Sequence, residues 1–387
     1  MTTIVSFLGF SDRLRRFMAQ SLTDKFLPDE QSDGPFNRLA LDLFVLQFQW
    51  NAAYRKLCEA RELSPENVSC WTDIPAVPTS AFKELELTSL QTAERSVVFH
   101  SSGTTGQKPS RHFHSHDSLT LYEASLTAWF QKHLIRERDG AVERNAAGAN
   151  SGIDFLVLTP PVCEAPHSSL VYMFETVLTK FGSPQSLFCG NARTDGAWSL
   201  DQSRAELFLS KASQSKRPWV VMGTAFNFVH LLDELAGQDR QFKLPPGSRV
   251  LETGGYKGRS RVLARTELHA LITERLGIPA DHIVCEYGMS ELSSQAYDWS
   301  IGQSRATGHV PRRFCFPPWA RTQIISPENG REVAEGETGL LRIFDLANVR
   351  SVLAVQTEDL AIRRADRFEL LGRAPTAEAR GCSLMAV

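Results

Sequence analysis

Short apolar segments that stop at a proline or a glycine recur through the middle of the chain. Residues 155–158 (Phe-Leu-Val-Leu) are followed by Pro160 and Pro161, and residues 219–222 (Trp-Val-Val-Met) stop at Gly223. A candidate helix, 228–235, follows the second segment. Short buried strands that alternate with helices are typical of layered α/β folds with a largely parallel sheet. We therefore predict the α/β class.

We expect three regions along the 387 residues. Residues 1–95 are predicted to be mainly helical, with a broad apolar segment at 39–48. Residues 96–345 carry the alternating strands and helices and form the α/β core. Residues 346–387 form a short C-terminal segment.

A loop rich in glycine and hydroxyl groups follows the apolar stretch 97–99, which we expect to be a short buried strand. Its residues are Ser101, Ser102, Gly103, Thr104, Thr105, Gly106, Gln107 and Lys108. Glycines allow positive φ, so successive N–H groups can converge on an anion, and Lys108 would add a positive charge. The spacing is neither that of a Walker P-loop nor that of the dinucleotide fingerprint. We interpret the loop as a cradle for the phosphates of ATP.

Two more blocks follow this loop in order. The first contains Gly254 and Gly255 within Glu-Thr-Gly-Gly-Tyr, and the second is 286–291, Glu-Tyr-Gly-Met-Ser-Glu. Taken alone, the second block is more often a plain helix cap. It comes after Val284, at the expected end of a strand, and ligands of open α/β sheets bind at the carboxyl ends of strands. The order of the three blocks favours a nucleotide site.

Composition excludes several other classes. The net charge is −2, and the pairs Arg312-Arg313 and Arg363-Arg364 are too short for a nucleic-acid surface, so we expect them to be solvated. Seven cysteines without a Cys-x-x-Cys pair argue against a disulfide framework or a zinc site, and they fit a reducing cytoplasm. No apolar run is long enough to span a bilayer, and we find no signal peptide.

Two further patterns invite a catalytic interpretation that we do not adopt. His112, His114 and His116 alternate as metal ligands on a strand would, but no fourth ligand is placed by spacing. Ser168 and Ser169 follow His167 without the Gly-x-Ser-x-Gly elbow of a hydrolase. We expect Ser168 and Ser169 to line the acyl or nucleotide pocket at most.

The three blocks resemble those of the adenylate-forming ligase superfamily, whose members use ATP to convert a carboxylate into an acyl-AMP and pyrophosphate. A closer resemblance is to the acyl-protein synthetase family, the long-chain-fatty-acid luciferin-component ligases of bacterial bioluminescence systems. It rests on four further stretches, at 48–54, 73–83, 167–170 and 380–383, and so covers nearly the whole chain.

The resemblance implies a fold like the N-terminal domain of the adenylate-forming ligases, together with ATP and Mg²⁺ as cofactors. It also implies roles for individual residues. Tyr287, in a turn with Gly288, would stack on adenine, and Glu291 would help to hold Mg²⁺. Asp359 would bind the ribose hydroxyls, although an aspartate at this place is often an ordinary strand-end residue. Arg373 matches the superfamily's hinge position, from which it can reach the nucleotide.

The chain departs from the superfamily at two places. Only 14 residues follow Arg373, so the mobile C-terminal domain and its catalytic lysine are expected to be absent. Lys108, Lys257 and Arg259 are candidates to stabilise the departing pyrophosphate in its place. In the phosphate loop, Lys108-Pro109-Ser110 replaces the common Pro-Lys-Gly order, which leaves the role of Lys108 open.

Cys382 lies near the chain end and matches the acyl-accepting cysteine of the acyl-protein synthetases. The nine residue steps from Arg373 span about 30 Å when extended, enough for the thiol to reach an active site. Arg380 would favour the nucleophilic thiolate. Without the resemblance, an incidental tail cysteine would be the preferred interpretation.

We therefore expect a cytoplasmic ligase that activates a long-chain fatty acid as acyl-AMP and loads it on Cys382. A partner acyl reductase would take the thioester and make an aldehyde, and the chain itself has nothing that resembles an NADPH site. Two alternatives stay open: transfer of a different acid to coenzyme A or a carrier protein, and a non-catalytic nucleotide-binding subunit of a reductase complex. Whether the chain forms an oligomer is also open.

Overall fold

The computed structural model describes residues 6–23, 30–101, 108–135, 152–194, 197–255, 261–301 and 312–374. The helices within these ranges are α1 (Phe7–Ser21), α2 (Glu30–Trp50), α3 (Ala52–Glu59), α4 (Ala81–Glu84), α5 (His116–Leu134), α6 (Ser169–Phe181), α7 (Gln202–Gln214), α8 (Ala225–Gly237) and α9 (Arg265–Leu276). Single 3-10 turns span Trp71–Asp73, Thr92–Glu94 and Ala280–His282. None of the described helices is long and apolar enough to cross a membrane.

Fifteen strands are described. They are β1 (Val77–Pro78), β2 (Val97–His100), β3 (Arg111–His114), β4 (Asp154–Val157), β5 (Leu187–Phe188), β6 (Gly190–Ala192), β7 (Trp198–Leu200), β8 (Trp219–Thr224), β9 (Arg249–Thr253), β10 (Ile283–Tyr287), β11 (Ala296–Tyr297), β12 (Ala320–Ile325), β13 (Thr338–Asp345), β14 (Ala354–Arg364) and β15 (Arg367–Arg373).

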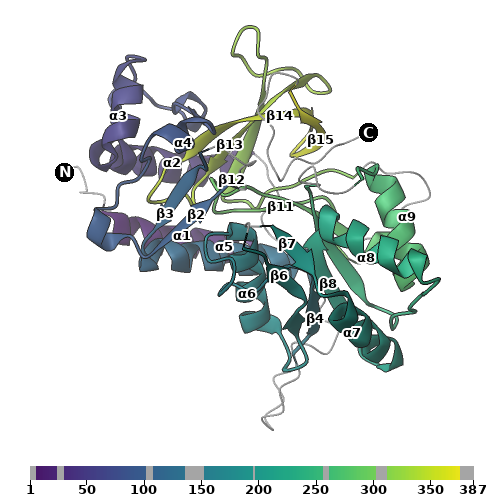
Figure 1. The fold of residues 1–387 in the computed structure, drawn as a ribbon. Helices are drawn as coiled ribbons and strands as arrows, with labels where there is room; N and C mark the ends of the chain where they lie inside the picture. Colours follow the sequence, from purple (N-terminus) through teal and green to yellow (C-terminus); the bar gives the residue numbers. More distant parts are fainter. Residues whose placement is uncertain are drawn as a thin grey trace.

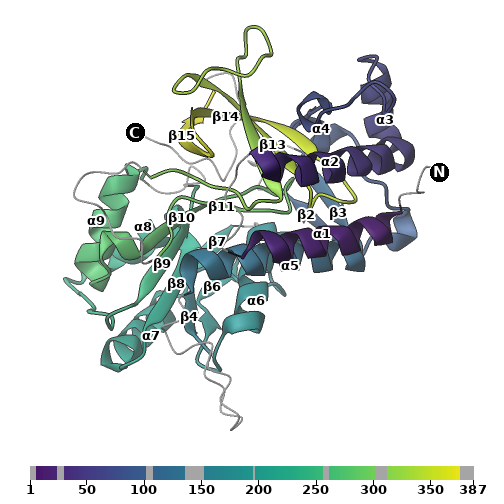
Figure 2. The same ribbon diagram turned by 180° about the vertical axis from the view of Figure 1, so that it is seen from behind.

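A six-stranded sheet, called the central sheet below, has the order β11-β10-β9-β8-β4-β5. Figure 2 labels five of its strands, β4, β8, β9, β10 and β11. Every pair between β10 and β5 is parallel, and only the short edge strand β11 is antiparallel. This confirms the predicted α/β class and the largely parallel sheet. The residues of β4, β8, β9 and β10 are all buried, because helices cover both faces of the sheet, and most of them are apolar.

Helices α7, α8 and α9 pack on one face of this sheet, and α5 and α6 pack on the other (Figures 1 and 2). The alternation along β9 and β10 separates the two cores: Val250 and Ile283 belong to the first, and Leu251 and Val284 to the second. The predicted helix 228–235 lies within α8, which begins directly after β8. There Thr224 caps the helix by accepting a hydrogen bond from the amide of Asn227 at 3.2 Å.

A second sheet is built differently from what the sequence pattern indicates. Strands β12, β13, β14 and β15 pair antiparallel in chain order, and the short β1 joins β14 in parallel. Strands β2 and β3 form a separate antiparallel pair. The strand expected at 97–99 is confirmed as β2, but only Phe99 in it is buried, whereas Val97 and Val98 are half-buried. A two-stranded ribbon cannot be covered on both faces as a central strand is.

The expectation that Arg312 and Arg313 are both solvated also needs correction. The side chain of Arg312 is only 10% exposed and forms an ion pair with the buried Asp298 at 3.1 Å. Arg313 is 37% exposed and pairs with Glu369. A sequence pair of arginines does not reveal this difference, because the partner carboxylates come from other elements.

Gln47, a fully buried side chain on α2, ties the N-terminal helices to the segment between β13 and β14. Its amide nitrogen donates to the carbonyl of Asn348 at 2.8 Å, and its oxygen accepts from the amide of Leu353 at 2.8 Å. We expect Gln47→Leu to lower the free energy of unfolding by about 3 kcal/mol, because it leaves buried backbone groups without partners. Urea denaturation measures this loss. The exposed Gln49→Leu, the same change two residues away, should cost little.

Candidate active site

The second and third glycine-containing blocks lie beside each other at the carboxyl ends of β9 and β10. In the parallel pairing of these strands, Glu252 is in register with Cys285 and Thr253 with Glu286. Gly254 and Gly255 follow β9, and Gly255 has a φ of 120°, a conformation that side chains rarely adopt. Tyr287 and Gly288 lie where β10 ends. The two blocks therefore meet at the edge where ligands of parallel sheets bind.

The residue just before the first block contacts the third block. The hydroxyl of Ser290 donates to the carbonyl of His100, the last residue of β2, at 3.0 Å. Ser101, the next residue, accepts a hydrogen bond from the amide of Ser110 at 2.9 Å through its hydroxyl, which closes the base of the loop. Residues 102–107 lie outside the described part of the chain, so the roles expected for Ser102, Gly103, Thr104, Thr105 and Gly106 stay predictions.

Tyr287, Asp359 and Arg373 form a connected group across two sheets. The Tyr287 hydroxyl donates to Asp359 Oδ2 at 2.8 Å. Asp359 on β14 is in register with Arg373 on β15, and Arg373 Nε lies 3.8 Å from Asp359 Oδ1. Arg373 also forms an ion pair with Glu358. The structure thus brings together three residues that the sequence placed far apart, two of them expected to bind the nucleotide's base and ribose.

Arg373 has a hydrogen-bond donor that is not satisfied within this group. Its Nη1 atom is buried and has no hydrogen-bond partner among the described residues. A buried guanidinium nitrogen without an acceptor costs free energy, and an anionic or hydroxyl-bearing ligand would remove that cost. The donor set therefore fits a nucleotide.

An aromatic cluster surrounds the ring of Tyr287, and no sequence pattern predicts it. The ring centroids of Phe314, Phe316 and Phe368 lie 6.0, 6.2 and 5.8 Å from that of Tyr287. Phe314 and Phe368 stack on each other and are joined by a β-bridge. Because the tyrosine is only 6% exposed, these rings fix its orientation.

Glu286, the first residue of the third block, is a buried carboxyl to which sequence reasoning gave no role. Burial, with the nearby charge of Glu252 adding to it, raises the pKa of Glu286 to about 7, although a hydrogen bond from Thr253 acts in the opposite direction. A Cβ at Gly288 would lie 2.3 Å from Glu286 Oε1, so a larger residue there would force the Glu286 carboxyl to move.

The remaining predicted residues are in different situations. Glu291 is buried, and its backbone carbonyl accepts a hydrogen bond from Asn348 Nδ2 at 2.9 Å. Lys108 Nζ lies 3.1 Å from Glu84 Oε2, and both side chains are exposed. Lys257, Arg259 and Cys382 lie outside the described residues. Their expected roles, like the Mg²⁺ role of Glu291, stay predictions.

His112 and His114 on β3 are buried side by side, with ring centroids 4.3 Å apart. Nδ1 of His112 lies 2.8 Å from the carbonyl of Ser290, which adds a second link between the β2–β3 pair and the third block. Ser168 caps α6 by accepting from the amide of Val171, and His167 stacks on His100 with centroids 4.5 Å apart. These contacts give both histidine motifs a positioning role in the described structure.

Burial lowers the pKa of His112 to about 4. Its pKa in the unfolded chain is about 6.5. Between pH 6.5 and 4, His112 is therefore mostly protonated in the unfolded state and mostly neutral in the folded state. The stability that neutral His112 contributes is complete above pH 6.5 and is lost as the pH falls. We expect wild type to lose about 2 kcal/mol between pH 7 and 5 from this residue, and His112→Asn to lack that loss. Urea denaturation at both pH values measures it, with the exposed His116→Asn as the control.

The chain is similar to known proteins over most of its length. The family described as "Acyl-protein synthetase, LuxE" matches residues 21–133 and 146–386. The long-chain-fatty-acid–luciferin-component ligase of Aliivibrio fischeri is 22% identical over 369 residues, which cover 90% of this chain and 86% of that protein. The ligase of the same name from Vibrio harveyi is 22% identical over 357 residues, with 90% and 86% covered.

Solved structures share the fold. A 2-hydroxyisobutyryl-CoA ligase in an open conformation, in complex with 2-HIB-AMP and CoA, superposes with a TM-score of 0.62 at 13% identity, covering 93% of this chain and 83% of that chain. The same ligase in its postadenylation state has a TM-score of 0.62, also at 13% identity, with 93% and 75% covered. The fold is therefore that of the adenylate-forming ligases.

Proposed function

Because the chain belongs to the acyl-protein synthetase family and is therefore a ligase, we propose that it activates a long-chain fatty acid with ATP and transfers the acyl group to its own Cys382. The observation that carries this proposal is the extent of the family match, which runs to residue 386 and so includes Cys382. The fatty acid follows from the names of the two relatives, both long-chain-fatty-acid ligases.

The site geometry supports the nucleotide half of the proposal. The Asp359 carboxylate, which accepts from Tyr287 and faces Arg373, would accept hydrogen bonds from the ribose hydroxyls. Arg373 Nη1 would donate a hydrogen bond to the nucleotide. The Tyr287 ring, held in place by its phenylalanine neighbours, would stack on the adenine. Glu291 would supply a carboxylate oxygen to Mg²⁺, whose chemistry is to offset phosphate charge.

The first half reaction makes the acid reactive. A carboxylate oxygen of the fatty acid attacks the α-phosphorus of ATP, a C(O)O–P bond forms, and the bond to the β-phosphate breaks to release pyrophosphate. Amide groups of the loop 101–108 and nearby cations would stabilise the charge on the departing group. Lys108 is available for this because its exposed ion pair with Glu84 is worth only about 0–1 kcal/mol, so the lysine can exchange partners. Lys257 and Arg259 are the other candidates.

The second half reaction moves the acyl group to sulfur. The thiolate of Cys382 attacks the acyl carbonyl carbon, a C–S bond forms, and the C–O bond to AMP breaks, so that AMP leaves with the electron pair. The thiol proton goes to solvent. A thioester keeps the acyl group activated, so a partner reductase with its own hydride donor could reduce it to an aldehyde. We propose such a reductase as the partner.

Fatty-acid-dependent exchange of labelled pyrophosphate into ATP tests the adenylation step. The purified chain is given ATP, Mg²⁺ and a panel of saturated acids of graded length plus an aromatic acid. Exchange with long-chain acids supports the proposal and identifies the preferred length. Exchange only with another acid favours the alternative ligase, and no exchange with any acid favours the non-catalytic subunit.

A further inference from the structure

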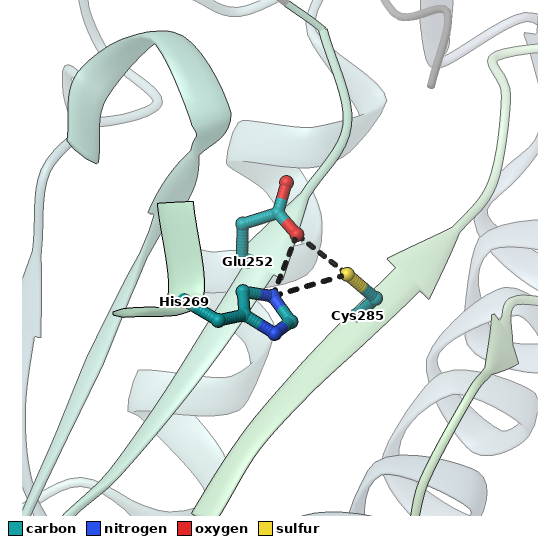
Figure 3. A group of neighbouring side chains, drawn as sticks. All are labelled: Glu252, His269 and Cys285. Carbon is teal, nitrogen blue, oxygen red and sulfur yellow. Dashed lines mark hydrogen bonds and ion pairs between the residues drawn. The ribbon is translucent and has the colours of Figure 1, made fainter. Parts of the chain in front are cut away.

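Three side chains that can bind a metal converge behind the glycine loop, on the face of the central sheet that α9 covers. They are Glu252 on β9, His269 on α9 and Cys285 on β10, and they point toward one another (Figure 3). Their ligand atoms all lie within 4.8 Å of one another. The register of β9 and β10 places Glu252 and Cys285 directly side by side, so the strand pairing itself builds two-thirds of the cluster.

All three side chains are removed from water. Glu252 is 1% exposed, His269 6% and Cys285 0%. A carboxylate, an imidazole and a thiol all lose their hydration on burial, and a bound cation would offset that loss. Arg265 interacts with Cys285 and Glu252, and it also pairs with Asp298 at 3.7 Å. Arg312 pairs with Asp298 as well, so one positive charge remains to face Glu252.

Two of the three distances between the ligand atoms are close to those of a tetrahedral zinc site. Zinc bonds of about 2.1 Å to nitrogen and 2.3 Å to sulfur put two such ligands about 3.6 Å apart. His269 Nε2 lies 3.8 Å from Cys285 Sγ and 3.8 Å from Glu252 Oε2. Cys285 Sγ and Glu252 Oε2 are closer, at 2.5 Å, so they would separate by about 1 Å on binding.

We propose that Glu252, His269 and Cys285 form a buried binding site for one zinc ion. Nitrogen, thiolate and carboxylate ligands together suit Zn²⁺ better than Mg²⁺, which takes oxygen ligands. The fourth position of the tetrahedron is filled by a water or by the second carboxylate oxygen of Glu252. The ion has a structural role, because no substrate reaches a fully buried site.

The position of the site explains what the ion would stabilise. Glu252 lies two residues before Gly254, and Cys285 lies two residues before Tyr287, so the ion clamps both strands that end at the candidate active site. His269 fixes α9 to the same strands. Cysteine spacing argued against zinc, but these ligands come from three elements and have no Cys-x-x-Cys pattern to detect.

The test measures metal in the full chain by inductively coupled plasma mass spectrometry, after exposure to ZnCl₂ and removal of loosely bound ions. We expect about one zinc per chain in wild type, loss of that zinc in Cys285→Ala and in His269→Gln, and retention in Cys189→Ala. Cys189 is a matched control because its thiol is also buried. It lies between β5 and β6, and β5 is at the opposite edge of the sheet from β10 and β11.

Cobalt gives a second readout, and its main result comes from the wild-type chain alone. Wild type loaded with CoCl₂ in place of zinc should gain a near-ultraviolet sulfur-to-cobalt charge-transfer band, and Cys189→Ala should keep it. Absence of bound zinc in wild type, absence of the cobalt band, or zinc retained by folded Cys285→Ala would each overturn the proposal.

Discussion

Replacing Cys382 with alanine is expected to abolish the covalent acyl-enzyme while leaving adenylation intact. In wild type, incubation with ATP, Mg²⁺ and a long-chain fatty acid should add the mass of one acyl group, seen by intact-protein mass spectrometry and removed by hydroxylamine. The variant should show no such adduct, because the acyl-AMP has no thiol to attack it. Pyrophosphate exchange should be unchanged, since that step precedes the thiol.

Cys163→Ala is the matched control for this experiment. Cys163 is an exposed free cysteine, so it would react first if the adduct came from non-specific transfer to accessible thiols. We expect Cys163→Ala to load as wild type does. An adduct that persists in Cys382→Ala would contradict the self-loading proposal. An adduct absent even from wild type, with AMP produced when coenzyme A or a carrier protein is added, would make the acceptor another molecule.

Asp359→Asn is expected to weaken ATP use by about 10- to 150-fold in kcat/KM, which corresponds to losing about 1.5–3 kcal/mol of charge-assisted hydrogen bonding. The carboxylate accepts from Tyr287 and faces Arg373, and an amide removes its charge from both. Because the ribose is held alike before and during the reaction, the loss should appear mainly in KM for ATP. Pyrophosphate exchange at varied ATP concentration measures both parameters.

Two further variants isolate the cause. Tyr287→Phe removes the hydroxyl that donates to Asp359 but keeps the ring. It should lower kcat/KM for ATP only about fivefold, which corresponds to about 1 kcal/mol. Asp366→Asn makes the same chemical change at an exposed position in the turn between β14 and β15, and it should have no effect. A normal KM for ATP in Asp359→Asn would remove this carboxylate from the nucleotide site.

Several local features could be predicted from the sequence because their cause is local. The apolar segments at 155–158 and 219–222 became β4 and β8, and the candidate helix 228–235 lies within α8. A run of apolar residues that ends at proline or glycine carries its own signal for a buried strand. The order of the three blocks gave the superfamily, and the match of the family over both ends of the chain confirmed the closer resemblance.

The antiparallel second sheet could not be predicted in the same way. Whether two neighbouring strands pair parallel or antiparallel depends on how the chain returns between them. The pattern of apolar residues in β12 and β13 does not encode that path. The partial exposure of Val97 and Val98 in β2 could not be predicted for the same reason. It depends on which strands pair with β2, and only β3 does.

The amino-acid sequence by itself determined the fold class, the family and the residues expected to meet the nucleotide. Only the tertiary structure decided which of them touch. Tyr287 and Asp359 are 72 residues apart yet share a hydrogen bond, and the phenylalanine cluster around Tyr287 comes from scattered positions. Two other features also depend on contacts between distant residues. They are the burial of Arg312 and the cluster of Glu252, His269 and Cys285. Their neighbours are set by strand register and helix packing, which join distant segments and leave no pattern in any one of them.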